Sequence, residues 1–349
     1  QKSVSCRISL DFGNNDIIKI KTQEVFAAIV YGKSGNRTTK FCDMKKTLLP
    51  VSLGIAHGIS DCAAGLIIGS LSSGMSIYGI GSMVLLYNIL AFAVQPLAGL
   101  ITDKLKNPKF AAVAGLGLMA ASIACFFVQP VAAVVMAGIA SAFFHVGGGA
   151  LALCVSPGKA SAVGLFSSPG VAGLAIGGYL AINAVFPAEI VIVLLLIIMT
   201  VIAISKTPEL PYQKTEKNID LEAHDYVMLA MLFAIALRSA VWNIFQYVEQ
   251  GEITNIILIS ISAAGGKIFG GYAGDHFGWK RYTYAAMFAA IPLLILGERS
   301  IYFLLPGIAL LQSVTPVFVA ALYRSMKRLP ATASGLSFGL AIAAGGVPF

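Results

Sequence analysis

The stretch GLITDKLKNPK, at residues 99–109, returns in altered form as GYAGDHFGWKR at residues 271–281. A second, unrelated pair of stretches repeats at nearly the same distance, with SAVGL at 161–165 and TASGL at 332–336. The offset is 172 residues for the first pair and 171 for the second. Two independent matches at one offset predict a chain built from two duplicated halves.

Apolar segments long enough to cross a bilayer occupy most of the chain around these repeats. Hydrophobic residues make up 57% of the sequence and charged residues only 11%, about half the charge of an ordinary soluble domain. A run of roughly 20 apolar residues can cross a bilayer as a helix, because it satisfies its own backbone hydrogen bonds. The composition therefore predicts an all-α polytopic membrane protein that has the lipid bilayer as a partner. The predicted spans lie near residues 48–71, 77–101, 110–128, 130–154, 160–185, 187–205, 227–247, 253–273, 282–297 and 301–323, with an eleventh from Ser334.

The repeat and the spans together predict two six-helix halves in parallel orientation. The N-terminal half covers residues 48–205, and a charged cytoplasmic linker at 206–226 joins it to the C-terminal half at 227–349. Twelve spans are expected and about eleven are present, because the sequence ends within the eleventh. Residues 1–47 form an N-terminal extension, in which apolar and polar residues alternate between positions 8 and 20 and predict a short β-hairpin.

Basic residues are distributed unevenly among the loops. They flank the first predicted span and fill the loops after even-numbered spans, whereas the loops after odd-numbered spans carry only Arg299. Because Lys and Arg are retained on the cytoplasmic side, we expect a multi-pass protein of the cell membrane whose N-terminal segment is cytoplasmic. The net charge of +8 then reflects topology, and nucleic-acid binding is not inferred from it.

Several classes of function lack support in the sequence. The five cysteines show no CxxC or CxH spacing, so neither a disulfide framework nor a metal site is predicted. The motifs GxxxxGK[ST], GxSxG and HExxH do not occur. We therefore predict no enzyme, no cofactor and no ATP-driven pump.

With its two six-span halves and a GxxxDxxxxxK/R loop after the second span of each half, the chain resembles the major facilitator superfamily of secondary transporters. The closer resemblance is to exporters of the fosmidomycin-resistance type. That subgroup usually continues the histidine of the fourth span as His-Pro-Glu, whereas Val146 and Gly147 follow His145 here. The stretches that carry the resemblance are HGISD at 57–61, QPLAGLITDK at 95–104, FFHVGGGA at 143–150, LRS at 237–239, GGYAGDHFGWKR at 270–281 and LPATASGLSFG at 329–339.

The resemblance implies that the repeated loop is a cytoplasmic gating motif, a latch that holds the outward-facing state. Asp103 at a helix end can pair with a nearby Lys or Arg, or with the positive N-terminus of a helix from the other half. The alternative is that the loop charges only set the topology. The residues assigned to the gating motif are Gly99, Asp103, Gly271, Asp275, Lys280 and Arg281.

Ionisable residues inside the spans are costly in hydrocarbon and need a partner or a water-filled cavity. His57 and Asp61 lie four residues apart and therefore share one helix face. His145 and Arg238 lie in the middle of the fourth and seventh spans, which line the central cavity in the family's architecture. We predict that Asp61 carries a coupling proton, because a desolvated carboxylate can titrate as the cavity opens and closes. The histidines would relay protons or orient substrate, and Arg238 would supply the counter-charge. Alternatively, Asp61 and Arg238 form a structural pair and the histidines are hydrogen-bonded between helices.

Glycines in the fifth span suggest close helix packing, and Gly173, Gly177 and Gly178 are the predicted contact residues. GLAIGG at 173–178 is similar to the antiporter motif GPxxGG and favours export by antiport. Lys267 also falls within a span, and we expect its long side chain to extend to the cytoplasmic interface in a structural role.

The sequence thus predicts a monomeric secondary active transporter that works by alternating access. It would expel a small organic molecule or drug against proton entry. Two alternatives remain open: a proton-coupled importer of a small organic anion, with Arg238 binding the anion, and a transporter-like membrane sensor or scaffold.

Overall fold

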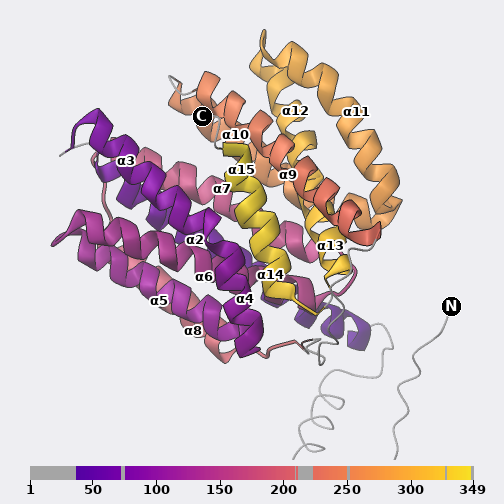
Figure 1. Ribbon diagram of the computed structural model, residues 1–349, viewed down its shortest axis with the longest axis horizontal. Helices are drawn as coiled ribbons and strands as arrows, with labels where there is room; N and C mark the ends of the chain where they lie inside the picture. The colour runs from indigo at the N-terminus through magenta and orange to yellow at the C-terminus, as the bar shows by residue number, and fades with distance from the viewer. Residues whose placement is uncertain are drawn as a thin grey trace, which may run out of the picture. The chain divides into compact units, whose positions relative to one another are not determined.

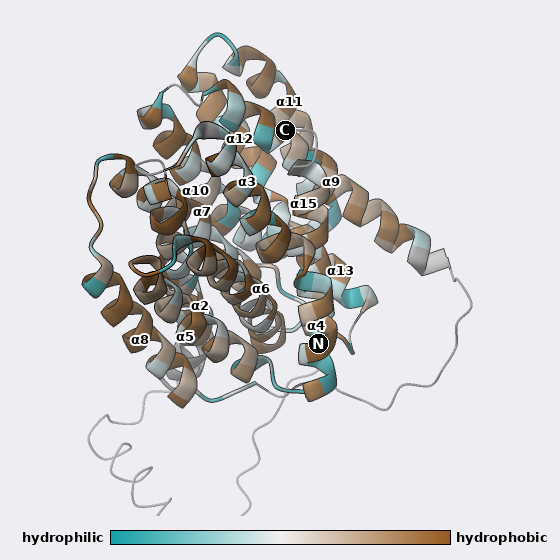
Figure 2. Ribbon diagram, turned by 60° about the vertical axis from the view of Figure 1, so that its left-hand side comes forward, coloured by the Kyte–Doolittle hydropathy of each residue, from teal (hydrophilic) through white to brown (hydrophobic). Residues whose placement is uncertain are grey.

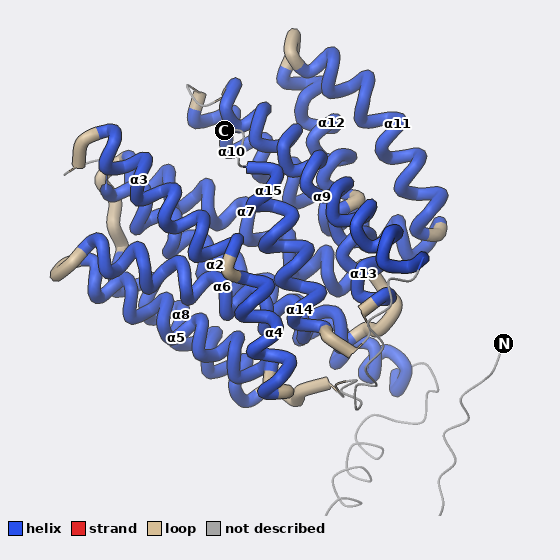
Figure 3. Tube along the Cα trace, in the orientation of Figure 1, coloured by secondary structure: helices blue, strands red, loops and turns tan. Residues whose placement is uncertain are grey.

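The computed structural model describes residues 37–71, 75–208, 210, 223–249, 252–326 and 328–346. The chain divides into two units, Gln1–Lys45 and Lys46–Phe349, and the features below belong to the second. All regular elements of the described residues are helices, and none is a strand (Figure 3). The predicted β-hairpin lies outside the described residues, and so does most of the predicted linker.

The helices of the N-terminal half match its six predicted spans, although the first one begins earlier than expected. It starts at Arg37, within the range that we assigned to the extension. In Figure 1 this half is indigo to pink. Its elements are α2 (Arg37–Ser70), α3 (Ile77–Asn88), η2 (Ile89–Ala93), α4 (Gln95–Leu105), α5 (Pro108–Phe126), α6 (Pro130–Val155), α7 (Ser161–Ile182) and α8 (Ala188–Ile204).

The C-terminal half repeats this order of helices and is orange to yellow in Figure 1. Its last elements, drawn yellow, contact α4 and α6 of the other half. The elements of this half are α9 (Ala223–Val248), α10 (Ile253–Phe277), α11 (Trp279–Gly297), α12 (Ile301–Ser313), α13 (Thr315–Ser325), α14 (Pro330–Ser334), η3 (Gly335–Leu340) and α15 (Ala341–Gly346).

Proline breaks two of the predicted spans into shorter pieces. Pro96 lies at the start of α4 and Pro316 at the start of α13. Proline has no N–H to donate to the preceding turn, so the regular hydrogen-bond ladder stops there. Before Pro96 the chain relaxes into the π-helical segment η2, where the Val94 N–H donates to the Ile89 carbonyl at 3.1 Å. The eleventh span contains a second π segment, η3, and the two segments contact each other.

Length and composition mark most of these helices as membrane-spanning. Eight segments of the described chain are long and apolar enough to cross a bilayer, and α8 is a shorter apolar helix. Large apolar side chains such as Phe233 and Phe288 are exposed on the outside of the bundle, and Figure 2 shows brown helices with teal concentrated at their ends. Such a surface suits hydrocarbon, so the chain is a multi-pass membrane protein.

The two halves meet along two pairs of helices that the repeat makes equivalent. On one side α7 packs against α10, and on the other α4 packs against α14 and η3. Glycines allow both approaches: a Cβ on Gly164 would lie 2.6 Å from the Lys267 carbonyl oxygen, and one on Gly335 would lie 2.5 Å from that of Gln95. Larger residues would separate the halves at these points.

Candidate functional site

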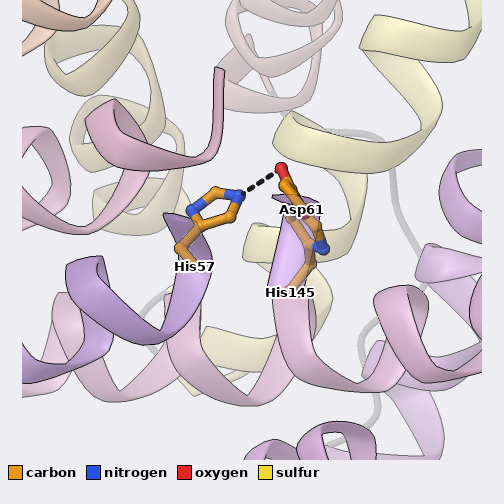
Figure 4. Close-up of side chains that lie close together, drawn as sticks. All are labelled: His57, Asp61 and His145. Carbon is orange, nitrogen blue, oxygen red and sulfur yellow. Dashed lines mark ion pairs between the residues drawn. The ribbon is translucent and has the colours of Figure 1, made fainter. Parts of the chain in front are cut away.

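A histidine and an aspartate on α2 form the centre of the candidate site. His57 and Asp61 are one helical turn apart, and their side chains are 6% and 14% exposed. The His57 Nε2 atom lies 3.2 Å from Asp61 Oδ2, and Figure 4 shows the ring directed at the carboxyl group. The predicted shared face of the helix thus brings the two side chains into direct contact.

His145 of α6 joins this pair from across the bundle. Its Nε2 atom lies 4.0 Å from Asp61 Oδ1, the other carboxyl oxygen. The two imidazole rings are 4.5 Å apart between centroids and meet edge to face. The structure therefore places His57, Asp61 and His145 together as one buried group, which we call the His–Asp–His cluster (Figure 4).

Backbone carbonyl groups orient both imidazole rings through the same ring atom, Nδ1. The Nδ1 of His57 lies 2.9 Å from the Phe166 carbonyl oxygen, and that of His145 lies 2.7 Å from the Ser141 carbonyl oxygen. A carbonyl oxygen only accepts, so each Nδ1 carries a hydrogen and donates it. Each ring therefore turns its Nε2 atom toward Asp61.

This arrangement determines where further protons can lie. The 3.2 Å contact of His57 with Asp61 needs a proton between two atoms that otherwise only accept. That proton makes either an imidazolium facing a carboxylate or a neutral imidazole facing a carboxylic acid. Asp61 Oδ1 is buried and has no hydrogen-bond partner among the described residues. A second proton, on His145 Nε2, would point at this oxygen, so the cluster can hold one or two exchangeable protons.

The glycines of α7 create the space that the cluster occupies. A Cβ on Gly170 would collide with the His57 ring and lie 2.7 Å from Asp61 Oδ2. Gly173 and Gly177 face the backbone of α2 at Gly58 and Cys62. Gly178 differs from the prediction, because the space beside its Cα is open.

Arg238 does not pair with Asp61, which corrects the predicted counter-charge. Its Nη1 donates to Gln312 Oε1 at 2.6 Å, and no ion pair joins it to Asp61 within the described chain. The reason is that Arg238 projects from α9 toward α12, where the buried amide of Gln312 meets it. No pattern of charges along the chain indicates this neutral partner.

Lys267 also differs from the prediction, because its side chain points inward. The residue is only 9% exposed, and its Nζ donates to the Ser167 carbonyl oxygen of α7 at 3.3 Å. It lies near enough to Asp61 and Arg238 for their charges to interact. A signal was present in the repeat: the offset of 172 lays Lys267 over Gln95, and both are buried four residues before a motif glycine.

The two motif aspartates bind helix N-termini of the opposite half. Asp103 accepts hydrogen bonds from the backbone N–H groups of Ala331 and Thr332 at 3.0 and 2.8 Å, and from the Thr332 hydroxyl at 2.7 Å. Asp275 accepts from the N–H groups of Ala160 and Ser161 at 2.8 and 3.0 Å. We call these two sets of contacts the clasps. They correspond to the second of the two partners foreseen for the loop, a positive helix end.

The other members of the gating motif divide into two groups. A Cβ on Gly99 would lie 2.6 Å from the Ala331 carbonyl oxygen, and one on Gly271 would lie 2.9 Å from Ser161 Cα. These glycines therefore allow the clasps to close. Lys280 and Arg281 are exposed, and neither forms a hydrogen bond or ion pair in the part of the chain described, so their latch role stays a prediction.

A tryptophan that the sequence reasoning missed supports the second clasp. Trp279 Nε1 donates to Asp275 Oδ1 at 3.0 Å. The guanidinium of Arg324, on α13, lies 3.9 Å from the centroid of the Trp279 ring. A cation over an indole face is a favourable contact, so the indole links α13 to the aspartate.

One group of side chains in the described chain has the make-up of a metal site, and it is the His–Asp–His cluster. Each of its residues offers one donor atom, and these atoms lie within 4.8 Å of one another. The 3.2 Å contact between His57 and Asp61 is the length of an ordinary hydrogen bond. A proton shared between the two atoms accounts for this distance.

Comparison with known proteins gives matches in structure only. No protein-family model matches the sequence, and no curated protein does. The N162A variant of the Escherichia coli fucose:proton symporter FucP is similar over 86% of this chain and 88% of its own, with 13% identity and a TM-score of 0.68. FucP in the outward conformation covers 86% and 90% at the same identity and TM-score.

The human organic anion transporter MFSD10 is similar at 16% identity and a TM-score of 0.63, over 87% of this chain and 92% of its own. These likenesses extend over nearly the whole length of both partners, so they concern the complete arrangement of helices. Together with the duplicated halves, they show that this chain has the fold of the major facilitator superfamily transporters.

Proposed function

We propose that this chain is a secondary transporter of the major facilitator type that couples the movement of its substrate to protons. The observation that carries the proposal is the His–Asp–His cluster, in which two backbone-held imidazoles direct their Nε2 atoms at one buried carboxyl group. No structural salt bridge needs this arrangement. A site that receives and releases protons does.

Several ionisable groups surround Asp61, so the number of protons on the cluster affects its interactions with them. The groups that face it are His57 on its own helix, His145 on α6, Lys267 on α10 and the buried Tyr87 on α3. With one shared proton the cluster is neutral, and with two it carries one positive charge. Because these charges are buried, each proton changes their interaction with the surrounding helices strongly.

Alternating access requires that the halves separate at one end while they close at the other. The clasps close the end that the positive loops predict to be cytoplasmic. They consist of hydrogen bonds between halves, which a rocking motion can break as a unit. The likeness to the fucose:proton symporter in its outward conformation supports the same closure here.

For the direction of transport we propose efflux, with a small organic molecule leaving as protons enter. The α7 segment that resembles the antiporter motif supports this choice, because Gly173 and Gly177 face the helix that carries the cluster. Import of a small organic anion together with protons is the second candidate. The buried basic residues Arg238 and Lys267 favour it, since neither has a carboxylate within salt-bridge distance among the described residues.

Proton movement in proteoliposomes tests the proposal. The full-length protein would be reconstituted with a pH-sensitive dye inside, and gradients of sugars, organic acids and lipophilic amines would be imposed in turn. We expect at least one substrate to change the internal pH with the native protein. Asp61→Asn should abolish this change, whereas Glu189→Gln, which removes an exposed carboxylate on α8, should preserve it. Equal proton movement in native protein and Asp61→Asn would refute the assignment.

A chelator separates protons from metal ions as the occupants of the cluster. If the cluster works with protons, treatment with EDTA on both sides of the membrane leaves the proton movement unchanged. Loss of movement with EDTA, and its recovery on addition of a divalent metal, would assign the three donor atoms to a metal instead.

A further inference from the structure

Two buried cations of the C-terminal half have no acidic partner among the described residues. Arg238 is 5% exposed and Lys267 is 9% exposed. The ion pairs of the described residues involve only His57, His145 and Asp61, so neither cation has a carboxylate within salt-bridge distance. An uncompensated buried charge costs several kcal/mol. Such residues persist where they meet a charge that the protein does not itself supply.

The guanidinium of Arg238 forms a hydrogen bond through Nη1, whereas its Nε forms none among the described residues. Nη1 donates to Gln312 Oε1 at 2.6 Å, and the same oxygen accepts from the Thr315 hydroxyl at 3.4 Å. Nε is buried and has no partner in the described part of the chain. A guanidinium has five N–H donors in a planar fork that suits the two oxygens of a carboxylate or phosphate. Gln312 therefore fixes the orientation of the group and leaves an anion-binding edge.

Lys267 provides a second buried basic group, whose charge interacts with that of Arg238. Its only hydrogen bond within the described chain is to the Ser167 carbonyl oxygen, so two of its three N–H donors are unused there. The hydroxyl of Ser167 is also buried without a partner among these residues. Helices α10 and α12 are in close contact, because Gly270 lies against the backbone of Ser313. Lys267 and Gln312 therefore lie on neighbouring, tightly packed helices.

The surroundings leave this region with an excess of positive charge. Of the described residues, Asp61 is the one buried carboxylate that interacts with Lys267, and His57 already shares a proton with it. Arg238 and Lys267 also repel each other. One or two negative charges are needed to balance the group, and an anionic ligand can supply them.

We infer that Arg238, positioned by Gln312, and Lys267 together bind the anionic group of the transported substrate, a carboxylate or a phosphate on a small organic molecule. This inference rests on the proposed function, because the ligand reaches these buried residues only when the halves move apart. Lys267 interacts electrostatically both with Asp61 and with Arg238, which would hold the anion. A bound anion reduces the positive potential that opposes a second proton on the cluster, so anion and proton bind together. Joint binding of anion and proton belongs to the second candidate function, import of a small organic anion with protons, and the inference rests on that candidate.

Thermal unfolding of the purified full-length protein tests the site with simple anions in place of the natural substrate. The probes are acetate, succinate and inorganic phosphate, with the neutral diamide succinamide as the control ligand. We expect at least one of the anions to raise the melting temperature, and succinamide to leave it unchanged. Arg238→Gln and Lys267→Gln should weaken the apparent affinity about tenfold or more, the effect of losing a charged hydrogen-bonding group. Arg299→Gln, at an exposed loop position, should respond as the native protein does.

Either of two results would overturn the inference: no anion acts differently from succinamide, or Lys267→Gln and Arg238→Gln respond as the native protein does. Lys267→Arg keeps the charge and should retain the response, which separates loss of the site from loss of the fold.

A second measurement needs no ligand at all. If Lys267 lacks a protein partner, Lys267→Met should unfold at the same or a higher temperature in the absence of anions. A clear decrease would make Lys267 a structural partner of Asp61 and contradict the inference. This outcome does not depend on the result for Asp61→Asn, so the anion-site and proton-site hypotheses can be refuted independently.

Discussion

His57 and His145 give Asp61 partners whose charge can change. A lysine or arginine in contact with Asp61 would keep the carboxylate ionised at any physiological pH. An imidazole can be neutral or charged, so the same contact does not by itself hold the carboxylate ionised. In the structure the cation Arg238 is hydrogen-bonded to Gln312, and the two imidazoles contact Asp61. This separation of permanent from exchangeable charge is what a coupling site requires.

Replacement of His57 by glutamine tests the role of an exchangeable proton directly. An amide can donate a hydrogen bond to Asp61 but cannot release the proton. We expect His57→Gln to fold and bind substrate while substrate-driven changes of internal pH disappear. The matched control is His276→Gln at an exposed position, which should behave as the native protein. Unchanged proton movement in His57→Gln would show that the imidazole is structural.

A methyl group at Gly170 should damage the cluster sterically. The added Cβ would meet the His57 ring and Asp61 Oδ2, both of which belong to the buried cluster. Overpacking of this kind costs about 1–3 kcal/mol. We expect Gly170→Ala to lower the melting temperature and to reduce proton-coupled transport.

Gly178→Ala is the matched control for this substitution, since the space beside Gly178 is open. Alanine favours the helix over glycine by about 0.5–1 kcal/mol, so the variant should be at least as stable as the native protein. If both variants unfolded at the native temperature, the described contact of α7 with the cluster would be wrong.

The sequence located three members of the candidate site but misjudged the contacts of two buried basic residues. His57 and Asp61 could be paired because helix geometry brings residues four apart together. The partner of Arg238 lies 74 residues away and is neutral, so no rule of charge pairing could indicate it. Lys267 was assigned to the interface because of its distance along the chain from Asp275. Only the close packing of α10 on α7 shows that its side chain stays inside.

At the scale of elements, the clasps join each half to the start of a helix in the other. Asp103 at the end of α4 accepts hydrogen bonds at the start of α14, and Asp275 at the end of α10 accepts them at the start of α7. A carboxylate at a helix N-terminus gains from hydrogen bonds and from the helix dipole together. Because the duplication places the two clasps at equivalent positions, we expect the two interfaces to open and close in the same way.

Removal of the aspartate charge should loosen the closed end. Asp103→Asn or Asp275→Asn loses a charge-assisted contact of about 1.5–3 kcal/mol, so the open state should gain roughly tenfold or more in population. The buried Cys154 thiol, 3.7 Å from Tyr323 Oη of the other half, reports this opening. With the other cysteines replaced by serine, we expect either variant to speed the reaction of Cys154 with a maleimide.

Lys280→Gln is the comparison for the clasp variants. Lys280 belongs to the same motif but is exposed and contacts no clasp residue in the described chain, so its loss should leave the labelling rate unchanged. Labelling that rises equally in Lys280→Gln and Asp275→Asn would favour the reading in which the motif charges only set topology. Labelling that rises in neither would contradict the clasps.

Span positions followed from hydropathy, but the breaks within spans did not. A window of apolar residues gives the same signal whether the backbone is α-helical or π-helical, so η2 and η3 were not foreseen. Pro96 and Pro316 were visible signs that a helix could be interrupted. The first helix extends back to Arg37 because polar residues also form helix outside the bilayer, where hydropathy carries no information.

For the whole molecule, two similar halves are the arrangement that the proposed alternating access requires. The halves touch along α7 with α10 and along α4 with α14 and η3, and glycines let the backbones approach at both places. The cluster belongs to the N-terminal half, whereas the buried basic residues Arg238 and Lys267 belong to the C-terminal half. Under the proposed function, a motion between halves would change the distance between the cluster and these basic residues, which would link proton binding to conformation.

Proton coupling at the cluster is tested by comparing substrate exchange with proton-driven accumulation in the same proteoliposomes. Exchange of labelled for unlabelled substrate across the membrane needs no net proton movement, whereas accumulation driven by an imposed pH gradient does. We predict that Asp61→Asn retains exchange and loses accumulation, while the native protein and Glu189→Gln perform both. Accumulation by Asp61→Asn at the native rate would contradict proton coupling at the His–Asp–His cluster.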